Sequence, residues 1–308
     1  MARIKANGIE IEYETTGSSN DPMMLLVSGF SGQLTRWPES LKRGLADAGR
    51  YVITFDNRDI GLSTEFTGKV PASPRDIVKA AAEGKPTGDM VPYVLDDMAA
   101  DAAALITALG ASQADVLGVS MGGMIVQLMA LNHPAQVRTL IPVMTTSGAP
   151  GLPQSDPAAQ AALTAVPDVR TAEAIAELSV KSRHAIGSAP ELRSSDMDVR
   201  AQSIADFNRS DRPLGVARQY AAILAQPRWH ERLVGVTIPT LVLHGAADPL
   251  IKPDAGRDIA ERIPSAEIDV IDKWGHDMPE KIVPTLLNRI VPFLARNAPE
   301  ATRANMSR

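Results

Sequence analysis

Apolar residues in this chain gather in short uninterrupted runs, and longer segments with helical periodicity separate these runs. Met23–Val27 contains no polar residue and lies between Asp21-Pro22 and Ser28-Gly29, as expected of a strand buried on both faces. Ile9–Glu14 alternates apolar and polar residues, which is typical of a half-buried strand. The same reasoning predicts further strands at Tyr51–Phe55, Asp115–Val119, Val137–Met144, Thr240–His244 and Glu267–Ile271.

Helical segments lie between these strands. Apolar positions recur at helical spacing in Val94–Leu109 and Met121–Asn132, which end before Gly110 and Pro134 respectively. Further helices are expected at Pro38–Ala48, Asp254–Arg262 and Lys281–Ala295. Strands that alternate with helices pair in parallel and form an open sheet with both faces covered. The pattern therefore predicts an α/β fold with a mostly parallel central sheet flanked by helices.

The alternation is interrupted between residues 147 and 228. This stretch is rich in Ala, Pro, Ser and charged residues, contains no convincing buried strand, and has helical patches at Thr171–Lys181 and Arg212–Ala225. We interpret residues 1–146 and 229–308 as one core and residues 147–228 as an inserted helical cap, or lid. Tyr220 and Trp229 are the residues that we expect to face the substrate from this side.

Composition and charge exclude several classes of protein. A hydrophobic content of 44 % with 22 % charged residues argues against disorder, and a net charge of −5 argues against a nucleic-acid binder. The absence of cysteine excludes disulfides, thiolate metal sites and a cysteine nucleophile. Because no apolar run is long enough to span a bilayer and the first 17 residues lack a signal-peptide core, we expect a cytoplasmic protein that does not bind membranes.

The main chemical signal is the sequence Gly-Val-Ser-Met-Gly at residues 118–122. It follows an expected strand and opens an expected helix, which is the context that gives the G-x-S-x-G pattern its meaning. A serine on such a sharp turn has an exposed hydroxyl, and only small residues fit two positions before and after it. The pattern favours Ser120 as a nucleophile, while the alternative is a glycine-rich turn with an ordinary serine.

A serine nucleophile needs a base, and the chain has five histidines. His276 lies in the loop after the last expected strand, at the sheet edge where doubly wound folds place reactive groups. It also follows the serine with an acid between them, which is the chain order that accompanies this turn. We therefore predict His276 as the base. We expect His184 at the surface and His244 as a buried structural residue.

The acid that orients the histidine should follow a strand between Ser120 and His276. Asp248 meets this condition, although an Asp before a Pro is also a common turn signal. The competing loop after Val137–Met144 has no carboxylate before Asp156, so Asp248 is favoured. Asp277 lies next to His276 in the sequence but is poorly placed to accept from its ring, and we predict a surface residue.

A tetrahedral oxyanion needs two hydrogen-bond donors. The backbone N–H of Met121, directly after the nucleophile, is the first candidate. The second should come from the glycine-containing loop that follows the strand Met23–Val27, and Phe30 N–H is the best candidate there.

These motifs, in this order, resemble the α/β-hydrolase fold family, and the overall pattern is similar to that of aclacinomycin methylesterase and related bacterial esterases. The resemblance rests on Ser28–Phe30, Phe55–Ser63, Gly118–Gly123, Leu243–Gly245 with Asp248-Pro249, and Gly275-His276. It implies a Ser-His-Asp esterase with an acyl-enzyme intermediate, and it implies that Arg58 and Asp59 tie loops together. Two features depart from the common pattern: Ser28 replaces a frequent histidine, and the insertion contains no recognised motif.

The expected activity is hydrolysis of carboxylic esters, including lactones or polyketide-type esters, on a small-molecule substrate. The same triad also serves carbon–carbon bond hydrolases and cofactor-free perhydrolases, and a ligand receptor with little turnover is a third alternative. No metal-ligand spacing and no dinucleotide motif is present, so neither a metal nor a cofactor is expected. The sequence leaves a homo-oligomer open.

Overall fold

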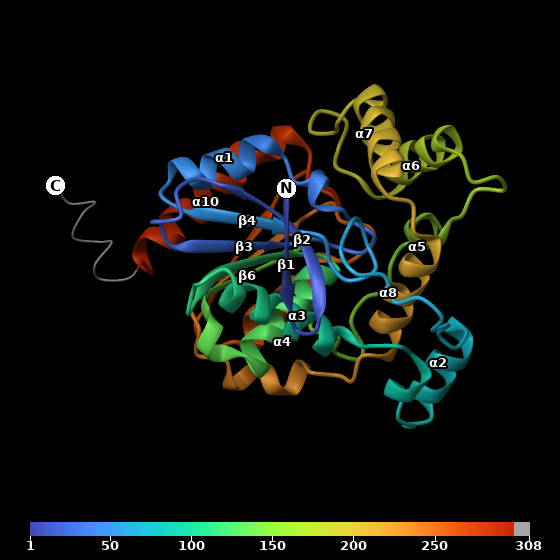
Figure 1. Ribbon diagram of the computed structural model, residues 1–308, viewed down its shortest axis with the longest axis horizontal. Helices are drawn as coiled ribbons and strands as arrows, with labels where there is room; N and C mark the ends of the chain where they lie inside the picture. The colour runs from blue at the N-terminus through green and yellow to red at the C-terminus, as the bar shows by residue number, and fades with distance from the viewer. Residues whose placement is uncertain (299–308) are drawn as a thin grey trace.

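The computed structural model describes residues 1–298, and its centre is one mixed eight-stranded sheet (Figure 1). The strand order is β1-β2-β4-β3-β5-β6-β7-β8. The pairs β1–β2 and β2–β4 are antiparallel and all other neighbours are parallel, which confirms the predicted fold class. The strands are β1 (Ala2–Ala6), β2 (Ile9–Thr16), β3 (Met23–Val27), β4 (Tyr51–Phe55), β5 (Ala114–Val119), β6 (Val137–Val143), β7 (Thr240–Gly245) and β8 (Ala266–Ile271).

Helices cover both faces of this sheet. α1 (Glu39–Asp47) and α10 (Val283–Arg296) pack on one face, above the sheet in Figure 1. α3 (Leu95–Ala108), α4 (Met121–Asn132) and α9 (Pro253–Arg262) pack on the other face. Each layer buries its apolar side against the strands, so the two apolar clusters of the core are separated by the sheet.

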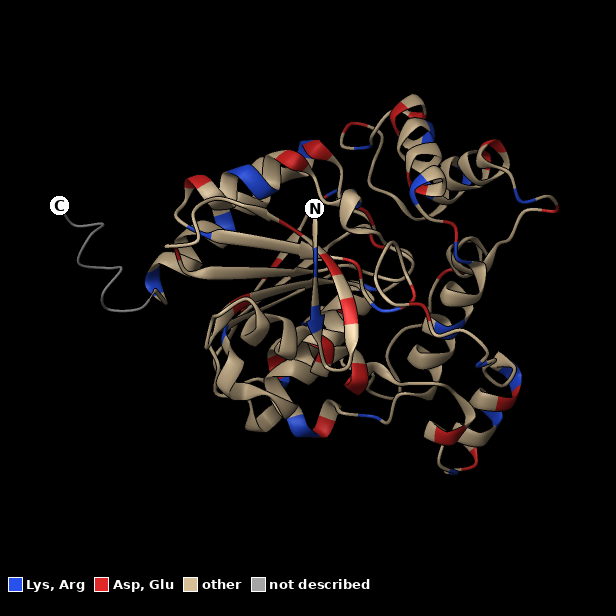
Figure 2. Ribbon diagram, viewed as in Figure 1, with Lys and Arg blue, Asp and Glu red and all other residues tan. Residues whose placement is uncertain are grey.

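The central strand β3 shows why its sequence is apolar throughout. Successive side chains point to opposite faces of a strand. Leu25 and Val27 belong to the cluster under α3 and α4, whereas Met24 and Leu26 belong to the cluster under α1 and α10. All five residues of β3 are buried, and the ribbon of this strand in Figure 2 carries no colour of a charged residue. A polar residue at any of these positions would lose its contact with water.

Four helices lie between β6 and β7, and we call them the cap: α5 (Pro157–Thr164), α6 (Ala172–Ile186), α7 (Asp196–Arg209) and α8 (Pro213–Ala225). They gather beside one end of the sheet in Figure 1, and the described chain forms no strand in this segment. The sequence predicted α6 and α8 but not α5 or α7.

Helix α2 (Pro74–Ala82) is a second insertion, between β4 and α3, and the sequence pattern did not reveal it. Ile77 of α2 packs against Ala221 and Ala225 of α8, so two distant segments contribute to the same side of the molecule. The signal that was missed is the helix start: the Ser73 side chain accepts from Asp76 N–H, and Pro74 occupies the first turn.

The remaining elements are short 3₁₀ helices. Within the described part of the chain, no helix has the length and apolar character needed to cross a membrane. Residues 299–308 of the predicted second core segment lie outside the described residues. The 3₁₀ helices are η1 (Leu34–Arg36), η2 (Gly88–Met90), η3 (Pro134–Gln136), η4 (His230–Gly235) and η5 (Glu280–Ile282).

Candidate active site

Ser120 occupies the sharp turn between β5, which ends at Val119, and α4, which begins at Met121. Its backbone has φ 53° and ψ −118°, a region that residues with a side chain rarely adopt. Ser120 N–H donates to Val143 O of the neighbouring strand β6 at 3.0 Å, which holds the turn in place. The strained turn is therefore built into the sheet, as the G-x-S-x-G spacing predicted.

The glycines around Ser120 are required by close backbone contacts. A Cβ on Gly118 would lie 2.1 Å from Gly122 O, and a Cβ on Gly122 would lie 2.1 Å from Val27 O. A Cβ on Gly123 would lie 2.6 Å from the Thr145 side chain. Real Cβ atoms do not approach heavy atoms this closely, so any larger residue would push α4 away from the sheet.

The structure brings Ser120, His276 and Asp248 together in one chain of hydrogen bonds. His276 Nε2 lies 3.0 Å from Ser120 Oγ, and His276 Nδ1 lies 2.7 Å from Asp248 Oδ2. The three residues follow β5, β8 and β7, so they meet at the carboxyl edge of the parallel strands. With a proton on Nδ1, the ring donates to the carboxylate and presents Nε2 as an acceptor to the serine hydroxyl.

Asp248 is held as a carboxylate by the groups around it. Its Oδ1 accepts from Leu250 N–H and Ile251 N–H, both at 2.9 Å. Burial by itself raises the pKa of this carboxyl, but the charge of His276 and hydrogen bonds from His244 and His276 lower the pKa well below its usual range. Asp248 therefore stays ionised at neutral pH, as a partner that orients the His276 ring must be.

His244 contacts the loop that carries Asp248, and the sequence did not predict this contact. The sequence predicted a buried structural residue, and the ring is indeed fully buried. Its Nε2 lies 2.8 Å from Ile251 O and 3.6 Å from Asp248 Oδ2. The ring thus joins the end of β7 to the loop that carries the carboxylate. The spacing of four residues between His244 and Asp248 was the only sequence signal.

The loop at residues 28–32 lies directly against the nucleophile. A Cβ on Gly29 would be 3.1 Å from Val119 O and 3.3 Å from Ser120 Cβ. Phe30 follows Gly29, so its N–H and that of Met121 lie on the two segments that flank Ser120. Asn57 Nδ2 donates to Ser28 O at 3.1 Å and holds the start of this loop.

The prediction that Asp277 is a surface residue is wrong. Asp277 is only 5 % exposed, because the cap segment that follows α6 covers it. Its Oδ1 accepts from the backbone N–H of Ser188 at 3.1 Å and from the Ser188 hydroxyl, and Arg183 Nη1 lies 3.3 Å from its Oδ2. His276 N–H also donates to Ile186 O at 2.7 Å. A sequence pattern could not show this burial, since the covering residues are some 90 positions away.

Arg58 and Asp59 connect loops, as the resemblance implied, and do not reach toward Ser120. The Arg58 guanidinium forms a buried two-point ion pair with Asp101 of α3 at 2.6 and 2.7 Å. Asp59 accepts from Arg218 of α8 at two points, both 2.8 Å, and from Tyr93 Oη at 2.6 Å. These pairs join the core to the cap and to the start of α3.

The residues expected to face the substrate differ in their surroundings. Tyr220 is half-buried, and its ring centroid lies 5.8 Å from that of Phe30, beside the nucleophile. Trp229 is buried and its indole N–H donates to Gln127 Oε1 of α4 at 3.2 Å. Tyr220 is therefore the better candidate for substrate contact. Trp229 instead anchors to α4 the segment that leads from the cap back to the core.

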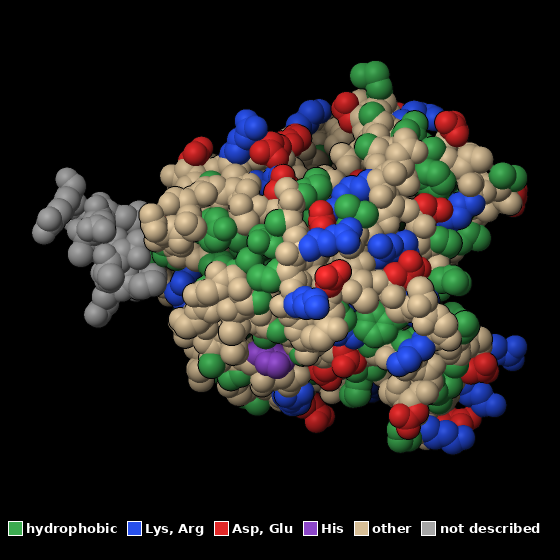
Figure 3. Space-filling view, viewed as in Figure 1, with side chains coloured by type: hydrophobic (Ala, Val, Ile, Leu, Met, Phe, Trp, Pro, Cys, Tyr) green, Lys and Arg blue, Asp and Glu red, His purple; other side chains and the backbone are tan. Residues whose placement is uncertain are grey.

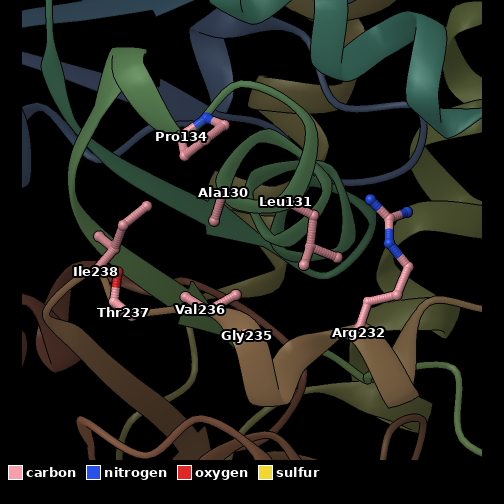
Figure 4. Close-up of a pocket in the computed structure, with 8 residues that line it drawn as sticks. All are labelled: Ala130, Leu131, Pro134, Arg232, Gly235, Val236, Thr237 and Ile238. Carbon is pink, nitrogen blue, oxygen red and sulfur yellow. The ribbon is translucent and has the colours of Figure 1, made fainter.

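Two surface pockets lie on the described part of the molecule, at different distances from this site. A cavity of about 450 Å³ is bounded by Thr146, Leu152, Arg228 and Leu250, next to the Asp248 loop. A cavity of about 220 Å³ lies at the far end of α4, between Ala130, Leu131 and the segment that precedes β7 (Figure 4). Since α4 rises about 1.5 Å per residue, that smaller cavity is more than 10 Å from the turn at Ser120. Of these two cavities, the larger borders the loop that carries Asp248, and neither is lined by Ser120 or His276.

Comparisons with known proteins identify the family to which this fold belongs. Residues 22–281 match the family model described as the alpha/beta hydrolase fold. The chain is 26 % identical over 300 residues to the rhodomycin D methylesterase DauP of Streptomyces sp. (strain C5), covering 90 % of this chain and 92 % of that protein. It is 24 % identical to 3-oxoadipate enol-lactonase 2 of Acinetobacter baylyi, covering 87 % of each chain.

A solved structure shows the same fold at low sequence identity. The enol-lactonase from Burkholderia xenovorans LB400 superposes with a TM-score of 0.70 and 19 % identity, over 95 % of this chain and 99 % of that chain. The mostly parallel sheet, the strained serine turn and a family match over most of the chain agree: this protein belongs to the α/β hydrolase fold family.

Proposed function

We propose that this protein is a serine hydrolase of carboxylic esters, with Ser120 as nucleophile, His276 as base and Asp248 as its orienting acid. The observation that carries the proposal is the unbroken chain of hydrogen bonds, 3.0 and 2.7 Å long, from the Ser120 hydroxyl through His276 to Asp248. The fold does not require a buried carboxylate, an imidazole and a strained serine to lie in this order. Their arrangement is what acyl transfer requires.

The proposed reaction runs in two halves. His276 Nε2 takes the Ser120 proton as the serine oxygen attacks the ester carbonyl, and Asp248 stabilises the charged ring. The Phe30 and Met121 N–H groups stabilise the oxyanion, and His276 then gives the proton to the departing alcohol. Water repeats the sequence on the acyl-enzyme and releases the acid. The buried position of His276 beneath the cap keeps bulk water from competing.

Small and medium water-miscible esters are the proposed substrates. Relatives named methylesterase and enol-lactonase act on ester bonds that lie within small molecules, which supports this class. Positive and negative side chains are interspersed on the face of the molecule that Figure 3 shows, including the cap. An enzyme that acts on oil droplets needs a broad apolar anchoring face instead.

Turnover of p-nitrophenyl acetate with active-site labelling tests the proposal. A fluorophosphonate probe should label the protein once, on Ser120, and Ser120→Ala should abolish both labelling and hydrolysis. Labelling or hydrolysis that survives this substitution would show that another group carries the chemistry. His276→Ala should lower kcat by roughly three orders of magnitude, with the circular dichroism spectrum unchanged.

A further inference from the structure

Gln219 of α8 bridges the cap to the loop that supplies a proposed oxyanion donor. Its side chain is fully buried, although glutamine is usually exposed. Gln219 Oε1 accepts from Ser31 N–H at 3.1 Å, and Gln219 Nε2 donates to Arg58 O at 3.0 Å. One amide therefore fixes the backbone of two core loops at once.

The loop that Gln219 holds is strained at the residue it contacts. Gly32 N–H donates to Gly29 O at 3.1 Å and closes a turn in which Ser31 has φ 59°. Glycine is the residue that adopts this conformation without cost, and a serine adopts it only where its surroundings enforce it. The hydrogen bond from Ser31 N–H to Gln219 is a cap contact made at this strained residue. The strained residue directly follows Phe30.

A second glutamine ties the other end of the same loop to the cap. Gln33 Nε2 donates to Asp206 O at 2.7 Å and to Ser210 O at 3.1 Å, at the end of α7. Arg209 Nη1 donates to Gln33 Oε1 at 2.6 Å. The loop at residues 28–33 is thus bonded to two cap helices, and Asn57 donates to its start from the core.

We propose that Gln219 is a positioning residue for ester hydrolysis, which sets the place of the Phe30 N–H through Ser31. The inference rests on the function proposed above and adds a role for the cap in the chemistry itself. An oxyanion donor acts only if it is fixed before the reaction, and a displacement of about 1 Å can cost about a hundredfold in rate. A cap that merely selected substrates would have no need of a buried amide bonded to this loop.

The chain offers a matched control on the same helix. Gln226 caps the end of α8 and also makes two amide hydrogen bonds to the core: Asp96 N–H donates to its Oε1, and its Nε2 donates to Asp96 Oδ2, both at 3.0 Å. These bonds reach the start of α3 and not the loop at residues 28–33. Gln219→Met and Gln226→Met therefore remove the same chemical group from the same element at two different docking points.

The test compares kcat, KM and inhibition in both variants with p-nitrophenyl acetate and p-nitrophenyl butyrate. Gln219→Met should lower kcat roughly ten- to a hundredfold for both esters, with little change in KM. The inhibition constant of a boronic acid, whose adduct with Ser120 mimics the tetrahedral intermediate, should rise by the same factor. Gln226→Met should stay close to wild type in kcat, whatever its effect on melting temperature.

Three outcomes would overturn the inference: a kcat of Gln219→Met close to wild type, equal losses in the two variants, or a change confined to KM. If Gln219→Met does not fold, Gln219→Asn decides, because its amide keeps the polar group but is one methylene too short to reach both Ser31 N–H and Arg58 O. A loss of kcat of tenfold or more with the fold intact supports the inference, and near-wild-type kcat in folded Gln219→Asn overturns it. If Ser120→Ala keeps its activity, both the proposed function and this inference are wrong. If activity is lost in Ser120→Ala but unchanged in Gln219→Met, only this inference is wrong.

Discussion

Replacing Asp248 with asparagine should disable the His276 base without disturbing the fold. The two backbone N–H groups of Leu250 and Ile251 both point at Asp248 Oδ1 at 2.9 Å. An asparagine must place its amide oxygen there, because the opposite orientation would set its NH₂ group against two donors. The NH₂ group then occupies the Oδ2 position, 2.7 Å from His276 Nδ1.

The size of the effect follows from this geometry. An NH₂ group cannot accept a hydrogen bond, so His276 must take the tautomer that is protonated on Nε2, and that nitrogen can no longer remove the Ser120 proton. Turning the amide over would lose two backbone hydrogen bonds, at about 1 to 3 kcal/mol each. The kcat should therefore fall by roughly 10³ to 10⁴, as when the acid of a serine protease triad is changed to asparagine. That loss corresponds to about 4 to 5.5 kcal/mol of barrier height.

The assay is steady-state hydrolysis of p-nitrophenyl acetate together with the rate of fluorophosphonate labelling of Ser120, since both need the base. Asp277→Asn is the matched control, because Asp277 is also a buried carboxyl beside His276 but contacts Ser188 and Arg183. The control should lower the melting temperature and keep kcat within about tenfold of wild type. Near-normal kcat in Asp248→Asn, or an equal loss in Asp277→Asn, would refute the reasoning.

Three further predictions follow. Gly122→Ala should destabilise the protein by about 3 kcal/mol or prevent folding, because the new Cβ would lie 2.1 Å from Val27 O. Urea unfolding measures this loss of stability. An unchanged unfolding midpoint would contradict the close packing of Gly122 against Val27. Folding lowers the pKa of Asp248, so its carboxylate contributes fully to stability above about pH 5 and loses that contribution progressively as the pH falls. Asp248→Asn should therefore lose less stability than wild type between about pH 5 and pH 2, as measured by urea unfolding across that range. Parallel curves would count against the direction of the pKa shift. Activity on p-nitrophenyl esters should peak at short acyl chains, without a rise on emulsified triolein, and strong activation by droplets would identify a lipase instead.

Local pattern was sufficient for the elements that form the core and for the triad. The runs Met23–Val27 and Tyr51–Phe55 became strands with these bounds, because a strand covered on both faces must be mostly apolar. The spacing of glycines around Ser120 and the order of the chain identified the serine turn, Asp248 and His276 as neighbours. These features depend on the chemistry of a few adjacent residues, and such chemistry is visible in a sequence.

What the sequence could not decide depends on contacts between segments that are far apart in the chain. Asp277 is buried because residues near position 188 cover it, and Gln219 acts on Ser31 across 188 positions. Helix α2 buries one large apolar side chain, Ile77, which packs against Ala221 and Ala225 of the distant helix α8. Burial, and the partner that a polar side chain finds, are set by the packing of whole elements. For this reason the sequence alone determined the sheet and the candidate catalytic residues, and only the tertiary structure decided how the cap contacts them.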